Sequence, residues 1–154
     1  MNTITQRILV HAFRITIKKA DILTVKYDEN RSVKNLVVKR GDIYYVDFGE
    51  KAGSKQGGIR PALVVSNNKA NKHSPVVTVV PLSARVWKKK YLPTHVQIPK
   101  GSGLNKPSMA LAEQVETLDK TRLGDRIGEV LDDMVMEQIT VALQIQIGAY
   151  AEYN

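Results

Sequence analysis

The chain has no cysteine among its 154 residues, and it has no long apolar run. The first absence excludes disulfides, thiolate nucleophiles and cysteine-ligated zinc, and it suits a reducing cytosol. The second argues against a membrane span, because the early stretch ILVHAF is too short and is followed at once by Arg14. We therefore expect a soluble, unexported, cytoplasmic protein without a membrane partner.

Metal-binding and nucleotide-binding signatures are also missing. The three histidines are far apart in the sequence, and none has a second ligand residue at helical spacing: they are His11, His73 and His95. The glycine pair Gly57 and Gly58 precedes a strand-like run, whereas a P-loop or a Rossmann turn joins a strand to a helix. We expect no metal, no cofactor and no ATP-dependent chemistry.

Positive charge is in excess: the formal net charge is +8 and the pI is about 9.7. Residues 107–154 carry three Lys and Arg against nine Asp and Glu, so the excess lies in the first two thirds of the chain. A basic surface favours an anionic partner, and nucleic acid is the commonest one. Solvated surface charge without a partner remains the alternative at this stage.

Five runs predict short strands of an antiparallel sheet. GDIYYVDFGE places Ile43, Tyr45 and Asp47 on one face and Tyr44, Val46 and Phe48 on the other. The other four runs are PALVVS, PVVTVVPLS, PTHVQIP and SMALAEQVETL. Their turn-rich connections favour a small sheet curled toward a barrel.

A helix is expected at the C-terminal end. Asp132 and Asp133 can cap it. Its apolar positions recur every four residues before Gly148: Val135, Ile139, Leu143 and Ile147. This stripe can pack on the sheet or on a second subunit, and the chain is expected to be an α+β domain.

Arg60 is the first candidate for chemistry, in the stretch KQGGIRPALVVSN. Its planar guanidinium keeps its charge and can hold two phosphate oxygens at once. The glycines allow close approach to a nucleic-acid backbone, and Pro61 opens the following strand. An isolated G-G-x-R-P is not specific, so a solvated hairpin arginine stays open on this evidence alone.

A second candidate region begins at Ser83, where a strand would deliver a hydroxyl to the rim of the sheet. The basic stretch ARVWKKKY follows immediately and includes Trp87 and Lys88. Aromatic faces can stack on unpaired bases while lysines follow the phosphates, which is typical of single-strand binding. A solvated basic loop with inward-packed aromatics is the alternative.

The order of these motifs resembles the MazF/PemK family of toxin endoribonucleases. The resemblance runs over residues 36–150 and rests on VKRGDIYYVDFGEKAGSKQGGIRPALVVSNN, SPVVTVVPLS, LPTHVQIP, LAEQVETLDKTRLGDRIGEV and the closing helix. It implies an SH3-like β-barrel with added helices, a homodimer, and metal-independent, sequence-specific cleavage of single-stranded mRNA. It also implies attack by the ribose 2′-OH, leaving a cyclic phosphate and a 5′-OH, and a MazE-like antitoxin as partner.

The resemblance assigns roles to individual residues. Arg60 matches the catalytic arginine of the GGxRP motif, and Ser83 falls where the family carries a catalytic Thr or Ser. Arginine is a poor general base, so charge stabilisation is the role we expect of Arg60, and the proton acceptor stays unassigned. The residues expected to contact RNA are Gln56, Gly57, Gly58, Trp87, Lys88 and Gln114. Glu113 is expected to be structural, and Lys55 stands where relatives can have an acidic residue.

Residues 1–35 do not resemble the family, whose members commonly begin near VKRGD. Two interpretations stay open. The segment is a basic extension, disordered or folded, or it precedes a non-AUG start near Leu36.

Two alternatives to the nuclease also stay open. The same fold is associated with gyrase-inhibiting toxins, and Ser83 in place of the commoner threonine is compatible with a catalytically silent nucleic-acid-binding module.

Overall fold

The computed structural model describes residues 36–85 and 92–151, and the expected N-terminal extension, 1–35, lies outside these ranges. Within them the strands are β1 (Asp42–Asp47), β2 (Ile59–Val64), β3 (Val76–Ser83), β4 (His95–Ile98), β5 (Ser108–Leu111), β6 (Glu116–Asp119) and β7 (Leu123–Glu129). The helices are α2 (Asn68–His73) and α3 (Asp133–Gln146), with 3₁₀ turns η3 (Ala112–Gln114) and η4 (Lys120–Arg122). Neither α2 nor α3 has the length and apolar character needed to cross a membrane.

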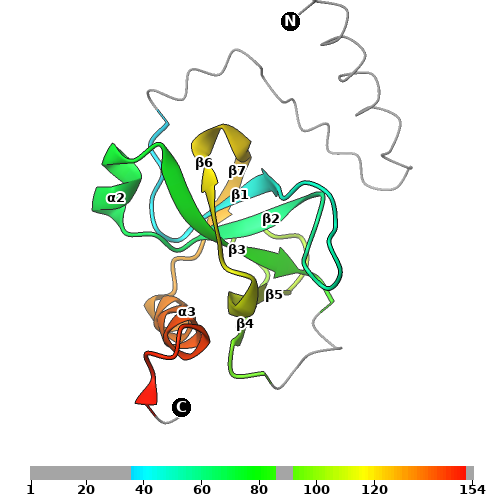
Figure 1. Ribbon diagram of the computed structural model, residues 1–154, viewed down its shortest axis with the longest axis vertical. Helices are drawn as coiled ribbons and strands as arrows, with labels where there is room; N and C mark the ends of the chain where they lie inside the picture. Colours follow the sequence, from blue (N-terminus) through cyan, green and yellow to red (C-terminus); the bar gives the residue numbers. More distant parts are fainter. Residues whose placement is uncertain (1–35, 86–91, 152–154) are drawn as a thin grey trace, which may run out of the picture.

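The strands form one antiparallel sheet in the order β4-β5-β3-β2-β1-β7 (Figure 1). β6 lies off this path and pairs with β3. β5 and β6 therefore share one edge of β3, with η3 at the break between them. The expected α+β class is confirmed, but the hydrogen-bonded ladder does not close into a complete barrel because β4 and β7 remain its two ends.

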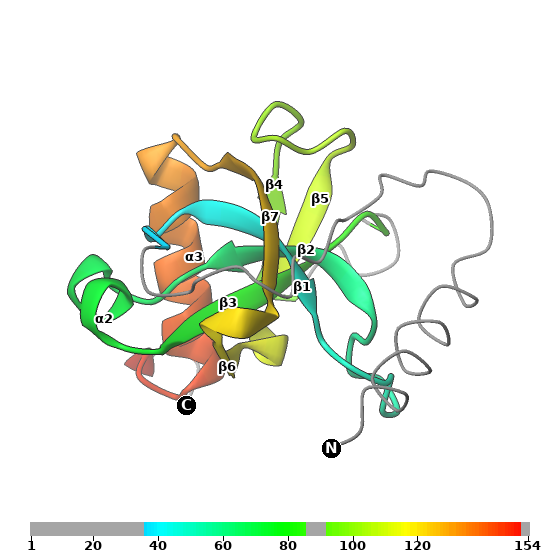
Figure 2. The same ribbon diagram turned by 90° about the horizontal axis from the view of Figure 1, so that it is seen from above.

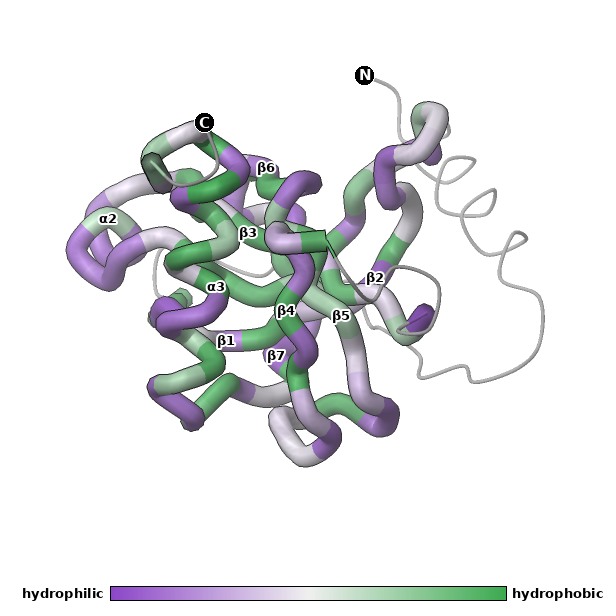
Figure 3. The backbone as a smooth tube through the Cα atoms, turned by 90° about the horizontal axis from the view of Figure 1, so that it is seen from below, coloured by the Kyte–Doolittle hydropathy of each residue, from purple (hydrophilic) through white to green (hydrophobic). Residues whose placement is uncertain are grey.

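Both faces of the central strands are buried, as the alternation in β1 predicts. Ile43 packs into one core cluster, whereas Tyr44, Val46 and Phe48 pack into a second cluster on the opposite face. β2 and β3 alternate in the same way between the two clusters. Hydrophobic segments consequently follow the strands at the centre of the molecule, and hydrophilic ones lie on α2 and the outer turns (Figure 3).

α3 covers the first of these clusters. The Asp132 side chain caps it by accepting a hydrogen bond from the backbone N–H of Met134 at 2.9 Å. Ile139 is fully buried in the cluster, and α3 contacts β4 and η3, so the apolar stripe packs on the sheet of its own chain (Figure 2). Ile147 is the exception: it follows the end of the helix and is 72% exposed.

The sequence prediction differs from the structure at two strands. SMALAEQVETL is not one strand, because η3 turns the chain at residues 112–114 and lets β5 and β6 follow different parts of β3. β7 is absent from the sequence prediction, since its LGDRIGE pattern lacks a β-branched run and carries two glycines. β7 nevertheless pairs with β1, with two register shifts along the ladder.

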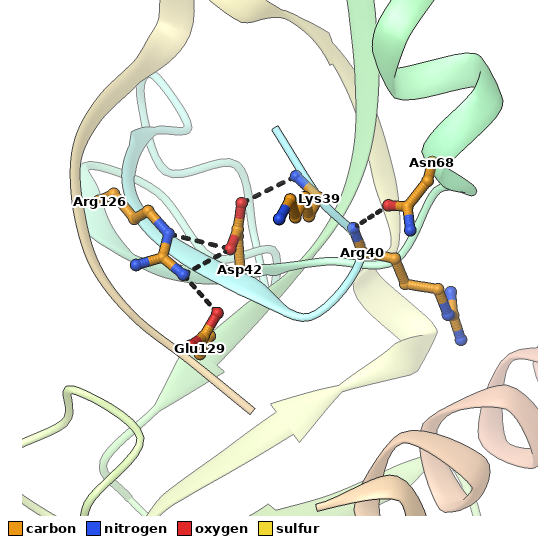
Figure 4. Close-up of polar contacts among 6 residues, drawn as sticks. All are labelled: Lys39, Arg40, Asp42, Asn68, Arg126 and Glu129. Carbon is orange, nitrogen blue, oxygen red and sulfur yellow. Dashed lines mark hydrogen bonds and ion pairs between the residues drawn. The ribbon is translucent and has the colours of Figure 1, made fainter. Parts of the chain in front are cut away.

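The segment before β1 is fixed by polar contacts with neighbouring elements (Figure 4). The backbone N–H of Arg40 donates to the Asn68 side chain at 2.7 Å. The Arg40 guanidinium donates to the Val65 carbonyl and, at 3.0 Å, to the Thr140 hydroxyl of α3. These contacts join the start of the sheet to both helices.

Asp42, the acidic residue of the RGD stretch, is a structural carboxylate. Its side chain is 3% exposed and accepts from the backbone N–H of Lys39 at 2.8 Å. Arg126 of β7 reaches the same carboxylate with Nε at 2.9 Å and Nη2 at 2.8 Å, and it also pairs with Glu129 (Figure 4). The motif thus holds β1 and β7 together.

Arg126→Ala is expected to lower the free energy of unfolding by about 3 kcal/mol, because it leaves the Asp42 carboxylate buried without its cation. This loss of stability is at the low end of the range for breaking a buried ion pair, because the Arg126 side chain is 42% exposed. Urea denaturation measures the change. Adding Asp42→Asn should recover part of the loss by removing the buried charge. A loss below about 1 kcal/mol, equal to that of the exposed control Lys106→Ala, would contradict this role.

Candidate active site

The loop between β1 and β2 is shaped by its glycine pair. The Phe48 N–H donates to the Gly58 carbonyl at 3.1 Å, and the Gly58 N–H donates to the Gly49 carbonyl at 2.7 Å. Gly58 has a φ of 73°, a conformation that favours glycine. Gly57 lies so close to Lys51 that a Cβ would come within 2.5 Å of the Lys51 Cα. Both glycines are therefore required for this loop to close.

Arg60 lies inside β2, opposite Val46 of β1, rather than in the loop itself. Its guanidinium turns back onto the loop, where Nε donates to the Gly57 carbonyl at 3.0 Å and Nη2 donates to the same oxygen. Nη1 donates to Oε1 of Gln56. The side chain is half-buried, and all three of these contacts are with neutral oxygens. None of these partners is an anion that would neutralise the guanidinium, which lies at the end of the sheet.

Gln114 of η3 contacts the same β1–β2 loop through its side-chain amide. Its Oε1 accepts from the backbone N–H of Gln56 at 2.7 Å, and its Nε2 lies 3.5 Å from the Ser54 carbonyl. Lys55 adds an ion pair with Glu116 of β6, with Nζ 2.7 Å from Oε2. The structure therefore brings together five of the residues that the sequence predicts to contact or cut RNA: Gln56, Gly57, Gly58, Arg60 and Gln114. The pairing of Lys55 with Glu116 is an addition that no local sequence signal indicates.

An open groove of about 500 Å³ lies along this contact. Its lining comes from the loop, the segment before β4, η3 and β6: Ser54, Lys55, Leu92, Glu113, Gln114, Val115 and Glu116. Polar side chains of the loop and of η3 are therefore available to a ligand lying in it.

Glu113 lines the groove, and its carboxylate is bound beside the start of β4. Its Oε1 is 2.9 Å from Nε2 of His95, and its Oε2 accepts from the Thr94 hydroxyl at 3.3 Å. The His95 side chain is 1% exposed, which agrees with a structural histidine. These contacts hold η3 against β4 and so fix the neighbouring Gln114. Among the described residues, no cluster of three or more His, Asp or Glu could hold a metal ion.

Ser83 is the last residue of β3 and lies at the same end of the sheet as Arg60. β2 and β3 pair in the register Ala62↔Pro81, and continuing this register by two residues brings Ser83 level with Arg60 on the same face. The Ser83 Oγ accepts from the backbone N–H of Arg85 at 3.3 Å. The end of β3 and the β1–β2 loop lie on the same side of the molecule in Figures 1 and 2.

Arg85 is not among the residues that the sequence predicts for the site. Burial and, secondly, the positive charge of Arg85 lower the pKa of Arg60 from its usual value. Arg85 follows Ser83, which the β2–β3 register places level with Arg60. The available signal was its place two residues after Ser83. Trp87 and Lys88, which the sequence does predict, lie outside the described residues.

A family model described as "PemK-like, MazF-like toxin of type II toxin-antitoxin system" matches residues 39–147, from the turn before β1 to the end of α3. The chain belongs to the PemK/MazF toxin family. Within this family it is 45% identical over 113 residues to endoribonuclease EndoA of Bacillus subtilis, which covers 73% of this chain and 96% of the relative. It is 41% identical over 115 residues to endoribonuclease MazF of Staphylococcus saprophyticus, covering 74% of this chain and 94% of the relative.

Solved structures of PemK/MazF proteins share the fold. MazF from Deinococcus radiodurans superposes with a TM-score of 0.63 at 27% identity, over 74% of this chain and 99% of the other. A mycobacterial endoribonuclease in complex with its cognate antitoxin superposes with a TM-score of 0.56 at 33% identity, over 73% of this chain and 94% of the other. The matched PemK/MazF region includes the loop, Arg60, Ser83 and η3.

Proposed function

We propose that this chain is the toxin of a type II toxin-antitoxin system and a metal-independent endoribonuclease that cuts single-stranded mRNA at a short sequence. The ribose 2′-oxygen attacks the adjacent phosphorus, and the bond from phosphorus to the 5′-oxygen breaks. The 2′-OH proton leaves to a base, and the 5′-oxygen takes up a proton. The products are a 2′,3′-cyclic phosphate and a 5′-OH.

The proposal rests mainly on the hydrogen-bond partners of the Arg60 guanidinium. Within the described residues its guanidinium donates only to neutral oxygens, those of Gln56 and Gly57, and no carboxylate forms an ion pair with it. A phosphoryl group accepts charge-assisted hydrogen bonds far better than a neutral carbonyl does. A guanidinium has five N–H groups, and these contacts use three of them. We infer that the scissile phosphate accepts from the other two, and that Arg60 stabilises the charge that builds up on the phosphorane.

Ser83 would complete the site as a hydrogen-bond donor. Its Oγ accepts from the Arg85 N–H, so its own hydroxyl proton remains available for a phosphate oxygen. Gln56, Gly57 and Gly58 would line the backbone of the RNA. Gln114 would offer its Nε2, which lies 3.5 Å from the Ser54 carbonyl, to a base edge. Trp87 and Lys88 remain proposed RNA contacts on the strength of their sequence alone.

The partners follow from charge and family. With a net charge of +8, the basic part of the chain suits an acidic, extended antitoxin segment as well as RNA. We propose that the chain acts in the cytoplasm as a homodimer, and that a MazE-like antitoxin covers the RNA-binding site.

Incubating the purified protein with a long RNA in EDTA tests the function. The expected result is cleavage at one short motif, with 5′-OH ends and 2′,3′-cyclic phosphates, at a rate that EDTA leaves unchanged. Replacing the nucleotide before the cut by its 2′-deoxy form should stop the reaction, because it removes the attacking hydroxyl. Intact RNA would contradict the proposal; trapped gyrase–DNA complexes in the same preparation would then indicate a gyrase inhibitor.

A further inference from the structure

We propose that Arg85 is a second phosphate-binding cation of the site, and that it holds the RNA phosphate next to the one on Arg60. The proposal rests on the proposed function, because it concerns how the same RNA is bound. It assigns Arg85 to substrate binding rather than to the chemical step.

The first support is the placement of Arg85 by the sheet. The β2–β3 register brings Ser83 level with Arg60, and Arg85 follows Ser83 by two residues. The hydrogen bond from the Arg85 N–H to the Ser83 Oγ turns the chain at this point, in the manner of a serine turn. The start of the Arg85 side chain is therefore held beside the hydroxyl that would face the phosphate.

The second support is the state of the two charges. Arg85 is exposed, and neither it nor Arg60 forms an ion pair with a carboxylate of the described residues. The two acidic residues that line the groove are already engaged, Glu113 with His95 and Glu116 with Lys55. Two cations that act on each other without a balancing anion repel, and a bound anion removes that repulsion. A nucleic-acid backbone supplies anions at regular short spacing.

The third support separates the roles of the two arginines. Arg60 is half-buried and fixed by three hydrogen bonds, so it can meet developing charge without reorganising. Arg85 is exposed, and its contact with Ser83 is made by its backbone N–H, so the charge of its side chain is screened by salt. Arg85 should therefore contribute to KM and to the salt dependence of binding, with little effect on kcat.

Arg85→Gln tests this role, because it removes the charge and leaves the backbone N–H that contacts Ser83. With an intact RNA that contains the cleavage motif as substrate, KM should rise roughly tenfold. The value of kcat should stay within about threefold. The slope of log affinity against log salt should become less steep by about 0.7, the value for one phosphate contact with a single strand. Lys69→Gln, on the exposed side of α2, is the matched control and should change none of these quantities.

Binding of RNA that carries a 2′-deoxy nucleotide at the cut site is measured in parallel, since it needs no cleavage. If Arg85→Gln binds this RNA as tightly as the unmodified protein and with the same salt slope, the inference is wrong even where cleavage is intact. If the unmodified protein cuts no RNA, the proposed function fails separately. A fall in kcat of a hundredfold at unchanged KM would also overturn the inference, because it would place Arg85 in the chemical step.

Discussion

Arg60→Ala is expected to lower the rate of RNA cleavage by about three orders of magnitude, with little change in the affinity for RNA. The guanidinium is the half-buried cation at the end of β2, and its hydrogen bonds to Gln56 and Gly57 hold it in place before substrate arrives. A preorganised charge of this kind stabilises the phosphorane more than the ground-state phosphate, so its loss should appear in kcat. Single-turnover cleavage at saturating enzyme measures that step directly.

Two further variants separate charge from geometry. Arg60→Lys keeps the charge but loses the planar fork, and we expect it to recover only a small part of the rate. Lys69→Ala removes a surface charge from α2 and should leave the rate unchanged. Because Arg60 lies at the edge of the core, the midpoint of thermal unfolding is measured for each variant. Cleavage by Arg60→Ala at a near-normal rate would show that this arginine has been wrongly assigned.

The strands that carry the site are predictable from sequence because each has a strong local signal. β1 alternates between two buried faces, and β2 and β3 are β-branched runs opened or interrupted by proline. α3 follows its four-residue stripe from the Asp132 cap, until the helix ends before Ile147. In each case the buried face is the one that the spacing of apolar residues along the element predicts.

The elements that the sequence does not predict lack such a period. α2, NKANKH, has six polar or small residues and depends on the Asn67 cap, whose side chain accepts from the Ala70 N–H at 2.8 Å. η3 interrupts a run of strand-forming residues because the chain must pass from one part of β3 to another. Such a turn is set by tertiary pairing, which overrides local propensity.

In the candidate site, too, some residues have a local sequence signal and others are brought together only by the fold. Arg60 and its glycines were indicated by a motif within one short stretch, and Ser83 by the end of a strand. By contrast, Gln114 meets Gln56, and Lys55 meets Glu116, across about sixty residues of sequence. Such contacts follow from the folded position of η3, which local patterns cannot supply. The sequence does not single out Arg85, because a cation in a basic stretch has no distinguishing feature until the β2–β3 register places Ser83, two residues before it, level with Arg60.

Gly57→Ala is expected to lower kcat/KM by about a hundredfold, because the loop could no longer hold Arg60 in its present position. An alanine Cβ would lie 2.5 Å from the Lys51 Cα and 2.6 Å from the Lys51 N, both backbone atoms that cannot rotate away. The loop would have to shift, and the Gly57 carbonyl that accepts from Arg60 would move with it. Cleavage kinetics over a range of RNA concentrations measure the loss.

Gly53→Ala is the matched control for this loop. Unlike Gly57, Gly53 adopts a left-handed conformation, with a φ of 57°, but a Cβ there would meet no atom within 4 Å. The substitution carries a backbone penalty of about 1 kcal/mol without a clash, so activity should stay within about threefold of the unmodified protein. The core clusters include no loop residue between Gly49 and Gly58, so both variants should unfold cooperatively near the normal temperature. If the two variants lost activity equally, general loosening of the loop, rather than the position of the Gly57 carbonyl, would be the cause.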